Sequence, residues 1–337
     1  MLSRITLRQL EYCLAAGDCK SIAEAAASIY VSPSSISAAI AHVESELGTN
    51  LFVRHHAQGL SATPLGEEVL KQMRAVLDHT MGLYGIVSES QASIRGPLRV
   101  GCFTTLAAMV TPELCQGFSR AHPEVEFTHI EDHQEGLIDR LQKGQIDIAI
   151  TYDLELQRTD VTFEPLATLP PHVIVGETSP LAQQRVLDLE SLAEQPMVLL
   201  DLPMSRDYFF ALFRALDLEP LVAARSSSPD VVRSLVANGV GYSLVNVRPR
   251  MSHALDGKRL MSLRLAGSHR PMRLGIASMP TERPRRVLEA FMQRCRTFIS
   301  DEHVPGMVAP SHFMWTPDDQ PKGAGSALRS SVSDYPA

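Results

Sequence analysis

Three side chains of types that bind metals alternate along one short stretch, at His129, Glu131 and His133. If this stretch is a strand, the alternation places all three on one face, where they could hold a metal ion. No fourth ligand is evident, so the metal signal is weak. We therefore interpret them as polar residues at a strand end, and we predict neither a metal nor a cofactor.

The sequence lacks motifs for enzymatic catalysis. It has no G-x-S-x-G elbow and no P-loop. The stretch GVGYSL, residues 239–244, has two glycines but lacks the third of a dinucleotide-binding fingerprint, and it fits a tight turn into a strand better. We predict no catalytic residues and no enzyme.

Polar side chains gather instead where predicted strands end, which is where ligands bind in open α/β sheets. The residues predicted to bind a small molecule are Thr104, Thr105, Glu131, Tyr152, Asp153, Ser205, Arg206, Ser227 and Asn246. Ser205 and Arg206 begin a predicted helix, whose N-terminus favours an anion, although Ser205 also fits a simple N-cap. An anionic metabolite is favoured, while Glu131, Asp132 and Asp153 leave an amine-bearing ligand open.

The elements that position these residues alternate between strands and helices, which predicts a parallel α/β sheet. Strands are predicted at residues 98–103, 125–131, 146–153, 197–201, 222–227, 241–246 and 272–278. Helices are predicted at about 107–121, 134–143, 205–216, 229–237 and 284–300.

The first thirty residues carry local signals for two short helices. Thr6 with Gln9, and Ser21 with Glu24, have the spacing of a capping box, in which each side chain bonds the other residue's backbone N–H. Gly17 is the predicted end of the first helix.

A third predicted helix has one apolar face and one face of small side chains. Ser32 is its predicted N-cap, Pro33 its first residue and Gly48 its end. The predicted buried positions are Ile36, Ile40, Val43 and Leu47, and those opposite are Ser34, Ala38, Ala41 and Ser45. Two short helices joined by a tight turn predict a helix-turn-helix, which places its second helix in the major groove of DNA.

This helix is poor in positive charge, yet its side chains suit base edges. Alanine packs on a thymine methyl, and serine bonds several bases. The predicted DNA-binding residues are Ser32, Pro33, Ser34, Ser35, Ser37, Ala38, His42, Arg54 and His55. Direct readout should be sparse, so DNA shape should add specificity. Protonated wing histidines would strengthen binding from about pH 8 to pH 6, although a solvated-surface role fits them as well.

The residues that follow indicate a hairpin and then a long helix. Residues 55–60, with Gly59 at the tip, fit a small wing. A helix is predicted from Pro64 to about Ser88, and residues 93–98 fit a hinge. The apolar positions of this helix that suit a partner helix are Leu70, Met73, Leu77, Tyr84 and Val87.

Composition bounds the function classes. The 337 residues are 45% hydrophobic, which is enough for two or three domain cores. No run of about 18 apolar residues and no signal peptide is present, so we predict a cytoplasmic protein without a membrane span. A net charge of −7 argues against a protein that coats polyanions, but not against a small DNA-binding module. The five cysteines are predicted to be buried free thiols.

From about Ile5 to Ser300 the chain resembles the LysR-type bacterial transcriptional regulators. The resemblance is carried by LRQLEYCLAA, SIAEAAASIYVSPSSISAAIAHVESELGTNLFVR, LSATPLGEEVL, GPLRVGC and VANGVGYSLVN. It implies an N-terminal winged helix-turn-helix, all-α with a β wing, then a long linker helix that dimerises and a two-lobed α/β effector domain like a periplasmic binding protein. It also implies that Arg54 approaches the minor groove, and that many relatives carry Gln or Arg where this chain has Pro33, Ala38 and Ala39.

The domain boundaries follow from these features. Predicted are a DNA-binding domain at 1–63, a linker helix at 64–92, a hinge at 93–97, an effector domain at 98–301 and a disordered tail at 302–337. Lobe I is predicted at about 98–163 and 269–301, and lobe II at about 164–268.

These observations predict a ligand-responsive transcriptional regulator that binds promoter DNA as a dimer or tetramer and senses a small metabolite between its lobes. RNA polymerase is a further candidate partner. The peroxide sensing of one family branch needs a cysteine pair in the second lobe, which this chain lacks. The alternative is a cytoplasmic small-molecule-binding protein or enzyme without a DNA role, and a mobility shift of promoter DNA separates the two.

Overall fold

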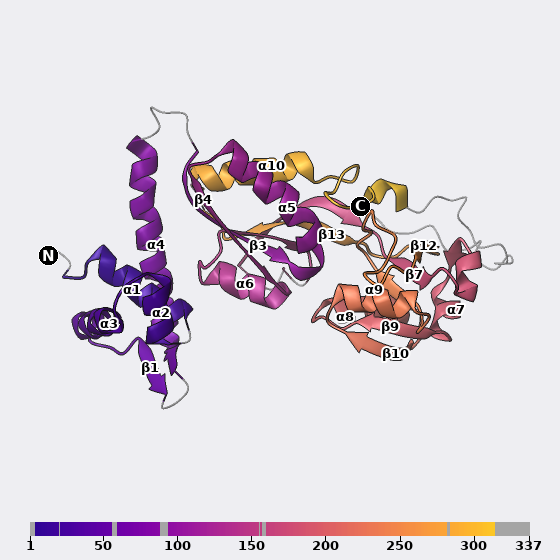
Figure 1. Ribbon diagram of the computed structural model, residues 1–337, viewed down its shortest axis with the longest axis horizontal. Helices are drawn as coiled ribbons and strands as arrows, with labels where there is room; N and C mark the ends of the chain where they lie inside the picture. The colour runs from indigo at the N-terminus through magenta and orange to yellow at the C-terminus, as the bar shows by residue number, and fades with distance from the viewer. Residues whose placement is uncertain are drawn as a thin grey trace, which may run out of the picture.

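A computed structural model describes residues 4–19, 21–55, 59–87, 94–154, 156, 160–281 and 284–313. A helical N-terminal domain is followed by one long helix and then by a two-lobed α/β domain (Figure 1). No helix within these ranges is long and apolar enough to cross a membrane.

The N-terminal domain is a winged helix-turn-helix. It consists of α1 (Leu7–Asp18), α2 (Ile22–Ser28), α3 (Pro33–Leu47), β1 (Phe52–His55) and β2 (Gly59–Ala62). The predicted capping box of α1 is confirmed, since Thr6 Oγ1 accepts the backbone N–H of Gln9 at 3.3 Å and Gln9 Oε1 accepts that of Thr6 at 2.9 Å. Ser21 Oγ likewise accepts the N–H of Glu24 at 3.1 Å and caps α2.

Two glycines have roles other than those predicted. Helix α1 continues through Gly17 to Asp18. A Cβ at Gly17 would lie 2.7 Å from Cδ1 of Leu70, so this glycine makes room for the long helix rather than ending α1. Gly59 is the first residue of β2, paired with His55, rather than the tip of the wing.

The long helix α4 (Pro64–Val87) begins directly after the wing. Thr63 Oγ1 accepts the N–H of Gly66 at 2.9 Å, and the N–H of Thr63 donates to the carbonyl oxygen of Leu51 at 2.9 Å. This joint fixes the start of α4 on the wing, because the same threonine caps the helix and bonds the preceding loop.

Lobe I is built on a five-stranded sheet with the strand order β4-β3-β5-β13-β6. It contains β3 (Gly96–Phe103), α5 (Thr104–Ala121), β4 (Val125–Asp132), α6 (Gln134–Gln142), β5 (Ile148–Tyr152), β6 (Thr162–Leu169), β13 (Met272–Ser278) and α10 (Arg286–Phe298). Strands β4, β3 and β5 are parallel, as predicted, but β13 runs antiparallel to both of its neighbours. Helices α5 and α10 cover one face and α6 the other (Figure 1).

Lobe II has a four-stranded sheet, β11-β7-β12-β8, and the parallel pair β9-β10. It contains β7 (His172–Gly176), η3 (Pro180–Gln183), β8 (Val186–Leu187), α7 (Leu189–Ala193), β9 (Pro196–Leu200), α8 (Ser205–Arg214), β10 (Leu221–Ser226), α9 (Pro229–Ala237), β11 (Ser243–Val245) and β12 (Leu260–Leu265). The sequence analysis missed β6 in lobe I and β7, β8 and β12 in lobe II. These strands follow another strand or η3, so the helix-strand alternation that revealed the other strands of the effector domain is missing there.

Three predicted boundaries differ from the structure. Strand β6 pairs with β13, so lobe I extends to Leu169 rather than to residue 163. Strand β3 begins at Gly96, inside the predicted hinge. Residues 302–313, predicted to be disordered, fold onto the effector domain and end in η4 (Pro310–Phe313), while the rest of the predicted tail lies outside the described residues.

Polar contacts join the DNA-binding domain and α4 to lobe I. Arg99 Nη2, on β3, lies 2.9 Å from an oxygen of Asp78 on α4 and 2.9 Å from Oδ1 of Asp147. Gln145 Nε2 donates to Oδ1 of Asp18 on α1 at 3.0 Å. The α6–β5 loop is therefore the part of lobe I that meets the DNA-binding domain.

Candidate DNA interface and effector site

Helix α3 exposes a face of small side chains. Its core side consists of Ile36, Ala39, Ile40 and Val43, which are all buried. The predicted outward residues Ser34, Ala38, Ala41 and Ser45 are all exposed. Leu47, predicted to be buried, is 43% exposed, because the helix ends there and Gly48 turns the chain away with a φ of 68°.

The N-terminus of α3 is held by a group of serine hydroxyls. Ser32 Oγ accepts the N–H of Ser35 at 3.2 Å, which confirms the predicted N-cap. It also lies 2.8 Å from the hydroxyl oxygens of Ser34 and of Ser35. The remaining predicted contact residues lie on or beside this face: Pro33 is exposed, Ser37 is half-buried, and His42 Nε2 lies 3.3 Å from the carbonyl oxygen of Arg4.

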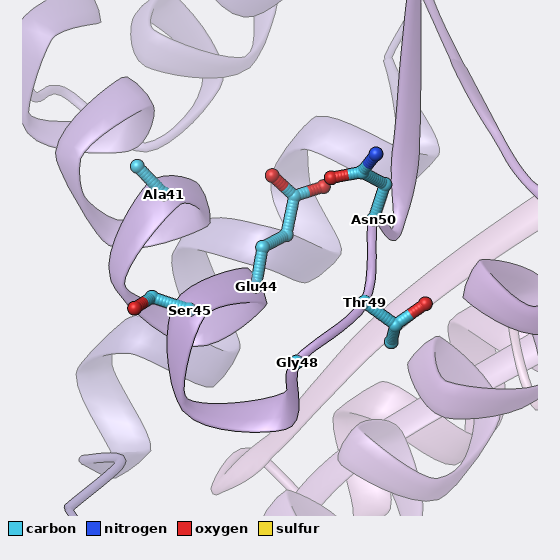
Figure 2. Close-up of a pocket in the computed structure, with 6 residues that line it drawn as sticks. All are labelled: Ala41, Glu44, Ser45, Gly48, Thr49 and Asn50. Carbon is cyan, nitrogen blue, oxygen red and sulfur yellow. The ribbon is translucent and has the colours of Figure 1, made fainter.

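A carboxylate on α3 fixes the wing. Glu44 Oε1 accepts the backbone N–H groups of Leu51 at 2.7 Å and of Phe52 at 3.1 Å. Figure 2 shows this side chain pointing from α3 toward the segment that carries Asn50. The sequence analysis assigned no role to Glu44, since nothing local in the sequence reveals a partner seven residues away. Its charge is used inside the domain, where it sets the position of β1.

The space beside Glu44 is a shallow surface hollow at the C-terminal end of α3 (Figure 2). The residues that line it are Ala41, Glu44, Ser45, Gly48, Thr49 and Asn50. Arg54 lies beyond it on β1, where it is exposed and paired with Leu60 of β2. The side chain of His55 lies outside the described residues. The exposed face of α3 and Arg54 on the wing are thus two separate solvent-facing surfaces of one domain.

Some of the predicted dimerisation residues serve the chain's own core. Met73 is 5% exposed and packs in the hydrophobic cluster of the N-terminal domain, with Leu70 and Leu77 against it. Val76, on the same helix, is exposed. The side chains of Tyr84 and Val87 lie outside the described residues.

Two predicted effector residues at the end of β5 are engaged within lobe I. Tyr152 is buried, and its hydroxyl lies 3.0 Å from Oγ1 of Thr105. Asp153 is 2% exposed, with Oδ2 located 2.7 Å from Arg273 Nε and 3.4 Å from Arg270 Nη2. The carboxylate is therefore neutralised by arginines from the other end of the chain, and two guanidinium groups share one negative charge.

The junction of the lobes carries a second polar group. Asn246, after β11, donates from Nδ2 to the carbonyl oxygen of Leu169 at 2.8 Å and to the Tyr208 hydroxyl at 3.2 Å. Tyr208, on α8, donates its hydroxyl to the carbonyl oxygen of Arg270 at 2.7 Å. The buried Asn246 Oδ1 has no hydrogen-bond partner among the described residues, so this acceptor is unsatisfied there. Sequence reasoning found Asn246 but missed Tyr208 and Arg270.

The other predicted effector residues are dispersed around these groups. Thr104 is half-buried at the start of α5, a helix without a side-chain cap. Ser205 is buried, while Arg206 pairs with Asp201 at 3.0 Å and with a neighbouring carboxylate at 3.4 Å. Glu131 and Ser227 are exposed on β4 and after β10. The structure thus brings Tyr152, Asp153 and Asn246 toward the lobe junction and leaves Glu131 and Ser227 at the surface.

The described part of the chain contains no metal-binding group of side chains, and two of its cysteines, Cys102 and Cys115, are unreactive. No group of three or more His, Cys, Asp or Glu side chains there could hold a metal ion. His133 Nδ1 lies 2.6 Å from Oδ1 of Asp132, so its nearest partner is a carboxylate. Burial raises the pKa of Cys102 and of Cys115 to about 12, which keeps both thiols protonated at neutral pH.

A winged helix-turn-helix with an exposed recognition helix, joined by a long helix to a two-lobed α/β domain, defines a DNA-binding regulator. Residues 7–67 match the model of the bacterial regulatory helix-turn-helix protein, lysR family, and residues 91–299 match the LysR substrate binding domain. The chain belongs to the LysR family of bacterial transcriptional regulators. It binds DNA through the first domain and a small-molecule effector in the second, and its relatives are named as regulators rather than enzymes.

Individual relatives agree with this membership. The transcriptional regulator CysB of Haemophilus influenzae is 26% identical over 274 residues, covering 81% of this chain and 84% of that protein. A putative LysR family regulator from Pseudomonas aeruginosa is 32% identical with a TM-score of 0.59, covering 88% of this chain and 99% of that one. The regulator CbnR in complex with its target DNA, at 22% identity and a TM-score of 0.51, shares the fold over 87% of this chain and 99% of that one.

Proposed function

We propose that this regulator reads DNA bases with the exposed face of α3, using Ser34, Ala38 and their neighbours. Arg54 contacts the phosphate backbone of the DNA. The observation that carries this proposal is the orientation of α3, whose small side chains all face solvent while its branched apolar ones are buried. The bond between Glu44 and the start of β1 supports it, because a fixed wing holds Arg54 at a constant distance from the helix.

The low positive charge of one DNA-binding domain implies that two or more subunits bind the DNA together. Residues 1–66 hold four Lys or Arg and five Asp or Glu, so the attraction of one DNA-binding domain for phosphates is small. We infer a homodimer or homotetramer in which α4 of one subunit packs on another, with Val76 as an exposed apolar residue for that contact. A cytoplasmic location belongs to the same proposal, because promoter DNA is found there.

Replacing Arg54 with alanine should weaken binding to all DNA sequences by about the same factor, because a phosphate contact carries no sequence information. The expected loss is roughly tenfold, with a shallower dependence of log Kd on log salt. Fluorescence anisotropy on two unrelated fragments enriched from genomic DNA by the unaltered protein measures both. Val53→Ala, at the adjacent exposed position, is the control. A loss confined to one of the two fragments would contradict the backbone role.

We further propose that the effector is a small anion bound at the lobe junction. Arg270 and Arg273 both pair with the single carboxylate of Asp153 there, which leaves one positive charge unbalanced. Both guanidinium groups are partly exposed, so a ligand can reach them. Arg206 contributes less, since it already pairs with Asp201 and Asp207. The buried, unsatisfied acceptor at Asn246 favours an anion that also carries an O–H or N–H donor.

A thermal-shift screen of small hydroxy acids, amino acids and inorganic phosphate tests this proposal. A ligand present at about 100 times its Kd should stabilise the domain by about 2.7 kcal/mol, a measurable rise in Tm. The Arg270→Ala variant should lose this rise, whereas Arg259→Ala, which removes an exposed guanidinium paired with Glu177, should keep it. Stabilisation by cationic amines instead of anions would overturn the charge assignment while leaving the DNA-binding function intact.

A further inference from the structure

The C-terminal segment after α10, residues 300–313, lies across both lobes. It leaves the end of α10 in lobe I and reaches the junction with lobe II (Figure 1). These residues follow the stretch that matches the family's substrate binding domain, which ends at residue 299. The sequence there contains Pro305, Gly306 and Pro310 and has no periodicity, so nothing in it predicts that it docks.

On the lobe I side, the segment is held by a side chain and by close packing. Asp301 Oδ1 accepts the backbone N–H of Thr168, on β6, at 2.6 Å. Gly306 packs against α5, where a Cβ would lie 2.7 Å from Cβ and 3.1 Å from Cα of Met109. Gly306 also has a φ of 70°, so both its conformation and its neighbour require glycine.

On the lobe II side, the segment forms a short antiparallel ladder with residues 248–250. Arg250 donates its N–H to the carbonyl oxygen of Gly306 at 3.0 Å, and Val308 donates to that of Arg248 at 3.0 Å. Arg250 Nε adds a bond to the carbonyl oxygen of Met307 at 3.0 Å. Val304 and Met307 are 0% and 2% exposed, so the contact is a packed part of the core rather than a surface association.

We propose that residues 300–313 form a strap that fixes the angle between the two lobes. In the described structure the backbone crosses between the lobes at residues 170–171 and 266–271, and two such crossings form a hinge. A third connection, bonded to β6 and α5 on one side and to residues 248–250 on the other, restricts rotation about that hinge. The strap thereby limits how far the lobes can open or close, whichever effector binds between them.

The test compares glycine positions with the same backbone conformation. Gly306→Ala places a methyl group against Met109, whereas Gly257→Ala, at a φ of 84° with nothing within 4 Å, imposes similar backbone strain without a neighbour. In the full-length chain, Gly306→Ala should speed hydrogen exchange of the Arg250 and Val308 amides by roughly tenfold or more. Gly257→Ala should leave these rates unchanged.

The lobe angle is read from electron-spin distances between labels at Glu126→Cys in lobe I and Glu219→Cys in lobe II, both exposed positions. A Cys19→Ser background removes the cysteine that is not buried, and dilution with unlabelled chain isolates intrachain distances. The strap predicts one narrow distance in the unaltered protein and a broad or second distance in Gly306→Ala.

A milder pair of variants keeps the proposal falsifiable if Gly306→Ala fails to fold. Asp301→Ala removes the acceptor of the Thr168 N–H and should broaden the distance, while Asp301→Asn keeps an oxygen acceptor and should restore the narrow one. A variant with fast exchange at Arg250 and Val308 but an unchanged narrow distance would overturn the proposal, because the lobe angle would then be kept although the segment no longer docks on residues 248–250.

Discussion

Replacing Ala38 with glutamate should abolish specific DNA binding. Ala38 is exposed at the centre of the outward face of α3, so the longer side chain does not disturb the core. A carboxylate there would be brought into a groove lined by phosphates and would also displace the small-residue contact with the bases. We expect affinity for an enriched DNA fragment to fall by about 100-fold or more, as measured by fluorescence anisotropy.

The control for this change is Ala108→Glu, which adds the same charge at an exposed alanine of α5 in lobe I. It should leave DNA affinity within about twofold, since Coulomb effects across more than a Debye length are screened at physiological salt. Circular dichroism should show both variants folded. If Ala38→Glu bound DNA as well as Ala108→Glu does, the face of α3 would not be the reading surface.

Features set by neighbouring residues were predicted well in the N-terminal domain. The caps at Thr6, Ser21 and Ser32 depend on partners three residues away, and all three N-cap bonds form, with the full capping box present at Thr6. The predictions that Leu47 is buried and that Gly17 ends α1 were wrong, because the surroundings of both residues depend on the path of the chain further on. Leu47 lies at a helix end, and Gly17 lies against a helix that begins almost fifty residues later.

The effector domain shows the same division more strongly. Strand ends locate Tyr152, Asp153 and Asn246 from the sequence alone. The sequence does not reveal that Asp153 is already paired, because Arg270 and Arg273 come from more than one hundred residues later. A polar residue at a strand end is therefore a guide to where a site lies, but its charge is available to a ligand only if no distant partner has neutralised it.

The C-terminal segment was mispredicted for a compositional reason. Proline and glycine at Pro305, Gly306 and Pro310 remove helical and strand periodicity, which normally indicates disorder. Here the same residues shape an irregular segment whose bonds go to residues 248–250 and whose apolar side chains, Val304 and Met307, are buried. Periodicity detects regular elements only, so a segment held by another part of the chain escapes it.

Replacing Gly66 with alanine should strongly destabilise the N-terminal domain. A Cβ at Gly66 would lie 2.0 Å from the carbonyl oxygen of Leu51 and 2.9 Å from its carbonyl carbon, which are backbone atoms that cannot rotate away. The start of α4 must therefore move away from the segment that carries Leu51, and both hydrogen bonds of Thr63 weaken. We expect a loss of about 3 kcal/mol, the upper range for overpacking.

Scanning calorimetry of the full-length protein measures this loss as a lower Tm of the transition that belongs to the N-terminal domain, which is treated separately because multidomain unfolding is not two-state. Glu68→Ala, an exposed position one half-turn further along α4, is the matched control and should change Tm little. Since Gly66 joins the wing to the linker helix, DNA affinity should fall together with stability. An unchanged transition in Gly66→Ala would show that α4 does not rest on Leu51, and the joint described between wing and linker helix would be incorrect.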